Sequence, residues 1–253
     1  MAIVLAQSVL GTHATGTYNN LGGTVTITAG PVTTSAGSFL VMVGYTSAQA
    51  TVNAVETVSP NAPTGGAGLT WRGAYTGSFL SGTTNRGGAA IFWVGNAPAQ
   101  TSVTFSMLVG AGGGTSGSTG SFVGECAFYE FTGVAASNNQ TLGGPILDAQ
   151  GQLLSQTSGT PHTANLTTSL TDLIIVASAA TGSALSAGSG YTLGLSTTAL
   201  SGVIGQLQYA LNVAAGSIAT SYLSGTPANW GAVSLALKPP PATGNNSYGF
   251  FFG

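Results

Sequence analysis

The sequence predicts an all-β fold, and three observations support this prediction. The apolar segments are short and rich in Val, Ile, Thr, Phe and Tyr, residues that favour strands. The chain contains 40 glycines and 10 prolines, and their spread along the whole chain separates these segments with turns. Convincing helical periodicity is absent. Together these observations indicate many short strands packed into a β-sandwich.

Individual segments predict two kinds of strand. TVTITAG from Thr24 and TSVTFSM from Thr101 alternate apolar and polar side chains, as a strand with one buried face does. SFLVMVGY (38–45) and DLIIVASA (172–179) are almost continuously apolar. We expect these two runs to be central strands that are covered on both faces.

The order of segments is repeated within the chain. Four segments of the first half have counterparts in the second: FLVMVGYTSA and LIIVASAATG, GLTWRGAYTGS and GYTLGLSTTA, AIFWVGNAPAQTSVTFSM and LQYALNVAAGSIATSYL, and CAFYEFTGVA and WGAVSLALKP. Matching segments lie about 134, 122, 116 and 106 residues apart, so the loops of the second copy are shorter. The two pseudo-repeats cover about residues 38–135 and 172–238.

Two arrangements of the halves fit this repeat. Each half, with four or five strands, could be a small domain of its own, or the two could interleave in one sandwich. No linker occurs at the midpoint, and each half alone would have a thin core, which favours the single sandwich. We therefore expect a jelly-roll-like β-sandwich of eight to ten strands over residues 24–238.

Several motifs resemble those of a widespread β-sandwich module. They are the FLVMVG strand, the GLTW turn and strand, the hairpin IFWVGNAPAQTSVT, the EFTGV strand and the closing WGAVSLALKP. The module is found in bacteriophage virion proteins and bacterial surface proteins and is described as concanavalin-like or jelly-roll. The matching residues run from about Phe39 to Lys238. The resemblance implies decoration, adhesion or carbohydrate contact, and it carries over no catalytic residue.

Two segments, residues 1–23 and 239–253, lie outside this module. The first contains the apolar strand AIVLAQSVL, and the second begins with three prolines, which favour a stiff polyproline helix, and carries no charge. We expect both to be extended assembly tails, because such segments can complete a neighbour's sheet or fill its pocket. The expected contact residues are Ile3, Val4, Leu5, Tyr248, Phe250, Phe251 and Phe252. The alternative is that both tails fold back on their own sandwich.

Charge is nearly absent, at 3% of residues against roughly 25% in an average soluble protein. A net charge of −2 leaves neighbouring copies free to approach one another, which favours self-assembly. Arg72, Arg86 and Lys238 are the only cations, too few to neutralise a run of phosphates, so neither nucleic acid nor an anionic membrane is an expected partner. The segment after Met1 lacks the features of a secretory signal, which points to release by lysis, within a particle or by a specialised exporter.

No motif predicts catalysis. His13 and His162 have no nucleophile elbow near them, so a Ser-His-Asp triad is not expected. Glu125 and Glu130 lie on one predicted strand, but their odd separation directs them to opposite faces, so they do not form a facing pair of acids. The other acidic residues, Glu56, Asp148 and Asp172, are isolated in the sequence and are predicted to be turn residues or to accept backbone hydrogen bonds.

Metal and cofactor sites are not expected either. One cysteine and two distant histidines do not provide a zinc site, and no EF-hand loop occurs. A calcium ion held by loop carbonyls is left open. Cys126 has no partner for an internal disulfide and is expected to be a small core residue.

The three tryptophans are candidates for stacking on sugar rings. Trp93 and Trp230 occupy strand positions that are typical of a core. Trp71, with Arg72 beside it, is therefore the candidate sugar contact.

These features predict a non-enzymatic structural protein on the surface of a bacteriophage virion, as head decoration or as a tail or fibre component. Its expected partners are copies of itself and other virion subunits. One alternative is a subunit of an extracellular filament or surface layer. Another is a carbohydrate-binding adhesin, whose partner would be a glycan.

Overall fold

The structure is a computed structural model. It describes residues 2–18, 22–50, 58–75, 79–81, 85–111, 120–137, 145–156, 159–181, 185–194, 203–223 and 229–241. These residues form strands, turns and extended segments without any helix, which confirms the predicted all-β class. Accordingly, no helix in these ranges is long and apolar enough to cross a membrane.

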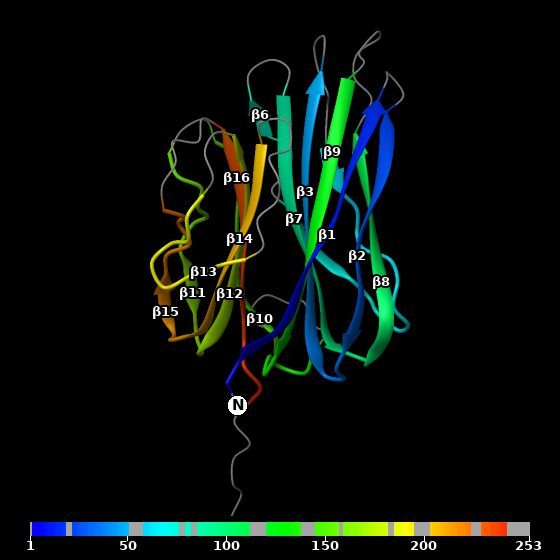
Figure 1. The fold of residues 1–253 in the computed structure, drawn as a ribbon. Helices are drawn as coiled ribbons and strands as arrows, with labels where there is room; N and C mark the ends of the chain where they lie inside the picture. Colours follow the sequence, from blue (N-terminus) through cyan, green and yellow to red (C-terminus); the bar gives the residue numbers. More distant parts are fainter. Residues whose placement is uncertain are drawn as a thin grey trace, which may run out of the picture.

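The first half of the chain forms a large sheet, here called sheet I, with the strand order β1-β9-β3-β7-β5; β6 also pairs with β7. Its strands are β1 (Val4–Tyr18), β3 (Ser38–Ala50), β5 (Arg72–Tyr75), β6 (Phe79–Ser81), β7 (Asn85–Ala97) and β9 (Gly120–Thr132). A smaller sheet, outer sheet I, has the order β2-β8-β4 and packs on one face of sheet I (Figure 1). It consists of β2 (Gly23–Thr34), β4 (Val58–Pro60) and β8 (Gln100–Ala111).

The second half repeats this arrangement. Sheet II has the order β10-β16-β12-β14-β13, and outer sheet II pairs β11 with β15. Their strands are β10 (Leu147–Gln156), β11 (Leu166–Thr168), β12 (Asp172–Thr181), β13 (Thr192–Leu193), β14 (Val203–Val213), β15 (Gly216–Ile218) and β16 (Trp230–Leu237). Figure 1 shows outer sheet II, sheet II, sheet I and outer sheet I as successive layers.

Strand pairing gives the equivalence of the halves residue by residue. In sheet I, Val41 lies between Tyr129 and Trp93; in sheet II, Ile175 lies between Leu235 and Tyr209. The spacings are therefore 134 (41 to 175), 106 (129 to 235) and 116 (93 to 209), the values that the sequence echo predicts. The equivalent strands β5 and β13 depart from the echo. Arg72 pairs with Trp93 and Thr192 pairs with Tyr209, so these two residues are equivalent and lie 120 residues apart rather than the predicted 122.

The structure differs from the expected single sandwich in two respects. None of the described sheets contains strands of both halves, so the halves pack face to face without interleaving. Within the residues that the structure describes there are also sixteen strands rather than eight to ten, because each half builds an outer sheet of its own. These outer sheets supply the second core that a four- or five-stranded half would lack.

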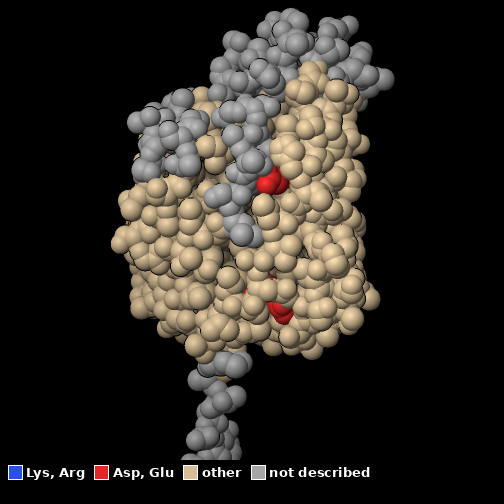
Figure 2. Space-filling view, in the orientation of Figure 1, with Lys and Arg blue, Asp and Glu red and all other residues tan. Residues whose placement is uncertain are grey.

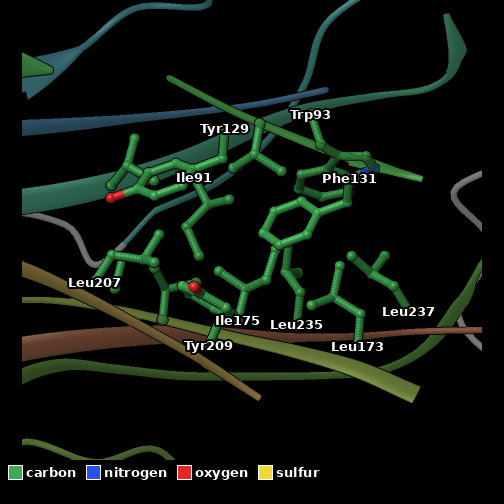
Figure 3. Close-up of a cluster of buried hydrophobic side chains, with 14 of the residues drawn as sticks. Ile91, Trp93, Tyr129, Phe131, Leu173, Ile175, Leu207, Tyr209, Leu235 and Leu237 are labelled. Carbon is green, nitrogen blue, oxygen red and sulfur yellow. The ribbon is translucent and has the colours of Figure 1, made fainter. Parts of the chain in front are cut away.

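The innermost core lies between sheets I and II. Aromatic side chains from sheet I, including Trp93, Tyr129 and Phe131, face aliphatic side chains such as Ile175 and Leu235 from sheet II (Figure 3). β3 and β12 are central in their sheets and buried on both faces, as their continuous apolar sequences predict. β2 shows the predicted burial of alternate residues.

The N-terminal segment is part of the sandwich, which corrects the expectation of an assembly tail at residues 1–23. β1 is the edge strand of sheet I and pairs antiparallel with β9. Ile3 is fully buried in the inner core, Leu5 packs against it, and Val4 is 48% exposed. The side chain of Asn212 holds Ile3 from both sides, accepting from its N–H at 2.8 Å and donating to its carbonyl at 2.9 Å. For this segment, the alternative of folding back on the same chain holds.

Candidate functional site

A surface groove lies where β9 and β16 end and where β10 and β12 begin. It has a volume of about 430 Å³ and is lined mainly by Ala, Pro and Leu side chains. The lining residues are Ala135, Ala136, Ser137, Pro145, Leu170, Lys238, Pro239, Pro240 and Pro241. Backbone hydrogen bonds fix its walls, because the N–H of Ala135 donates to the carbonyl of Lys238 and the N–H of Lys238 donates to that of Ile146, both at 2.9 Å.

The groove adjoins a buried group of charged residues. The ammonium of Lys238 lies 3.3 Å from Oδ1 of Asp148. Asp148 also accepts hydrogen bonds from the backbone N–H and the hydroxyl of Ser169. Asp172, at the start of β12, is fully buried beside them, and its carboxyl group faces that of Asp148. No sequence pattern predicts this cluster, since its members lie on three separate strands or their ends.

The two carboxyl groups of this cluster differ in acidity. Burial raises the pKa of Asp172 to about 7, and the nearby negative charge of Asp148 adds to the rise, against the opposing effect of Lys238. Burial also raises the pKa of Asp148, but hydrogen bonds from Ser169 and the charge of Lys238 outweigh it, so the net pKa is lowered. Asp172 is thus a neutral acid below about pH 7, beside an ionised partner.

The other two described carboxylates point to opposite faces of sheet I, as their spacing predicts. Glu130 accepts hydrogen bonds from the backbone N–H of Ser35 at 2.9 Å and from the side chains of Ser38 and Gln7. Glu125 lies 3.4 Å from Nδ1 of His13. Each glutamate is 2% exposed. Facing away from each other, they form no acid pair across a groove.

The candidate sugar contact lies at the rim of the core between sheet I and outer sheet I. Trp71 packs partly against this core, with its ring edge-to-face on Phe105 at 5.4 Å between centroids. The indole N–H of Trp71 and Nε of Arg72 are buried and make no hydrogen bond. Trp93 and Trp230 are buried, as predicted. Sugar contact at Trp71 and Arg72 stays a prediction.

Other predicted residues are readily placed. Cys126 is buried among apolar side chains of the core between sheet I and outer sheet I, as expected. In the ranges that the structure describes, no group of three or more His, Cys, Asp and Glu side chains is arranged to hold a metal ion. Tyr248 and the three phenylalanines Phe250, Phe251 and Phe252 fall outside the described residues, as do Glu56 and the side chain of Arg86.

Comparison with known proteins adds no relative. The chain matches no protein-family model, no curated protein and no solved structure. Its resemblance to the jelly-roll module therefore stays a prediction from sequence motifs, and the proposal below depends on the surface and the groove.

Proposed function

We propose that this protein is a non-enzymatic structural subunit on the surface of a bacteriophage virion, as head decoration or as a tail or fibre component. In this role it assembles with copies of itself and with other virion subunits. The proposal joins the virion-type motifs of the sequence with one property of the folded chain, namely the lack of charge on its surface.

Nearly all the charged side chains that the structure describes are largely buried. Glu125 and Glu130 are 2% exposed, Asp172 is fully buried, and the side chains of Asp148 and Lys238 are 6% and 13% exposed. The face drawn in Figure 2 accordingly shows red at only two small places, and no blue, among its described atoms. Such a surface offers little electrostatic repulsion between copies, which is the observation that carries the proposal.

The test is electron microscopy of the native material together with sedimentation of the full chain over a range of concentrations. Assembly into particles, rings or fibres supports the proposal, and the shape separates a virion component from a cellular filament. A chain that stays monomeric at millimolar concentration contradicts it. A glycan array, repeated with Trp71→Ala, then tests the adhesin alternative.

A further inference from the structure

We propose that the groove beside Lys238 is the docking site for residues 242–253 of a second copy of this chain, with Phe250, Phe251 and Phe252 as the side chains that fill it. The proposal rests on the self-assembly proposed above and names the contact that produces it.

The groove has the chemistry of an apolar receptor. Leu170 is 44% exposed and forms part of its lining, together with the rings of Pro145 and the proline run 239–241. The ammonium of Lys238 is directed to Asp148, so the groove offers little to a polar ligand. A volume of about 430 Å³ falls within the usual range of ligand sites, roughly 300–1,000 Å³.

The segment after Pro241 has matching chemistry. Residues 242–253, ATGNNSYGFFFG, contain no charged side chain and four aromatic ones. A phenylalanine buries about 150–250 Å² when it enters a core or interface, so three of them supply a substantial apolar contact. Three of these aromatic residues, Phe250 to Phe252, are consecutive.

Its length and its point of departure favour a neighbour over the same chain. Twelve extended residues span roughly 40 Å, about twice the radius of gyration of roughly 18 Å expected for 253 residues. The prolines at 239–241 line the groove, and proline favours an extended chain at the start of the segment. Return to the same groove would require a reversal within residues 242–249, whereas a second copy requires none.

A tail of one copy in the groove of the next is a head-to-tail contact. The donating and receiving surfaces differ, so every copy in a chain of contacts can both donate and receive. Such contacts close into rings or continue as fibres, depending on the rotation between copies. Because nearly all the described charged side chains are buried, electrostatic repulsion hardly opposes the approach of one copy to the next.

Two full-length variants test the contact in complementary ways. The tail variant carries Phe250→Ser, Phe251→Ser and Phe252→Ser; the groove variant carries Leu170→Gln and Ala136→Gln. Glutamine adds no charge, and both groove positions are exposed, so folding and surface charge are kept. Leu223→Gln, at a 55% exposed leucine outside the groove, is the matched control.

Sedimentation velocity is measured for each variant alone and for an equimolar mixture of the tail and groove variants. We expect each variant alone to associate about tenfold or more weakly than the unchanged chain, and the control to associate normally. In the mixture, the intact tail of one variant meets the intact groove of the other, so heterodimers form.

Three results overturn the inference. A groove variant that assembles like the unchanged chain shows that the tail uses another site, and leaves the proposed assembly standing. Variants that each lose assembly but give no heterodimer when mixed show that the tail fills the groove of its own chain. An unchanged chain that never associates removes both this contact and the proposed function.

Discussion

The two halves of the molecule share one strand order but stabilise their outer layers differently. In the first half, β2 and β8 run twelve residues each, and the core between them and sheet I contains sixteen buried apolar residues among those that the structure describes. In the second half, β11 and β15 are three residues long and the corresponding core has eleven buried residues. The second half therefore has less apolar surface with which to hold its outer layer.

Polar side chains replace apolar ones at equivalent positions. Phe92 corresponds to Gln208 (92 to 208) and Phe128 to Ser234 (128 to 234), by the same spacings as their neighbours in the sheets. Gln208 accepts from the N–H of Gly188 at 2.7 Å and donates to the carbonyl of Thr220 at 3.0 Å. One topology is thus held by apolar packing in one half and by a buried hydrogen-bond network in the other.

The largest expected difference is at the Phe92 and Gln208 pair. Phe92→Ala leaves a cavity in the core of the first half and should lower the free energy of unfolding by about 3–5 kcal/mol. Gln208→Ala leaves two backbone groups without a partner and should cost roughly 1–3 kcal/mol. Urea unfolding of both variants measures the difference. Equal losses would contradict the contrast between the two outer layers.

The buried acids of the two halves provide the second comparison. Asp172 corresponds to Ser38 (38 to 172), whose hydroxyl donates to Glu130. Glu130 is thus surrounded by donors, whereas the carboxyl group of Asp172 faces a second carboxyl group, that of Asp148. In the first half, hydrogen bonds offset the desolvation free energy of the buried acid. In the second half, the carboxyl group avoids that free-energy cost by staying protonated.

Asp172→Asn tests this difference through pH. The pKa of Asp172 is about 7 in the folded chain and about 3.9 when unfolded, so the folded state binds the proton more tightly. Stability from this group is present below about pH 4 and is lost as pH rises to about 7. The variant cannot ionise and should lack this decline, so at pH 8 it should be more stable by up to a few kcal/mol.

The measurement is thermal unfolding of both proteins from pH 4 to pH 8, with Ser38→Ala as the control at the equivalent position. That control loses a hydrogen bond to a buried carboxylate and should be less stable by about 1.5–3 kcal/mol. A variant that follows the pH profile of the unchanged chain would show that Asp172 is already ionised at neutral pH.

Sequence reasoning reaches the sheets more readily than the site, for a physical reason. The apolar runs of β3 and β12 and the repeat of the halves are local patterns, so they predict which strands are central and which residues are equivalent. The cluster of Asp148, Asp172 and Lys238 forms only when strand ends 24 to 90 residues apart meet, and the groove joins Ala135 to Lys238, 103 residues apart. The expectation of an assembly tail is wrong for β1 because an apolar segment has the same pattern whether its partner is β9 or a neighbouring copy.

Close packing between the halves gives a prediction of intermediate size. Gly205 corresponds to Ala89 (89 to 205), and a Cβ added to it would lie 2.3 Å from the ring of Tyr45. Tyr45 is fully buried, and its Cβ would also lie only 2.7 Å from the added Cβ. The ring therefore cannot move aside freely. Gly205→Ala should therefore cost about 1–3 kcal/mol through overpacking. Adding Tyr45→Phe to Gly205→Ala should not restore stability, because the clash involves ring carbons rather than the hydroxyl. Urea unfolding measures both variants, and a double variant as stable as the unchanged chain would contradict this account.

The smallest expected effect is at another equivalent pair, Asn96 and Asn212. Both have positive φ, at 50° and 56°, a conformation in which glycine is unstrained. Asn212 differs in that its side chain also clamps Ile3. Asn96→Gly should be nearly neutral, whereas Asn212→Gly relieves the same backbone strain but loses two hydrogen bonds, for a net cost of about 1 kcal/mol. Hydrogen exchange should then be faster at Ile3 and at the start of β1 in Asn212→Gly alone. Unchanged exchange there would mean that pairing with β9, rather than the asparagine clamp, holds the N-terminal strand against the second half.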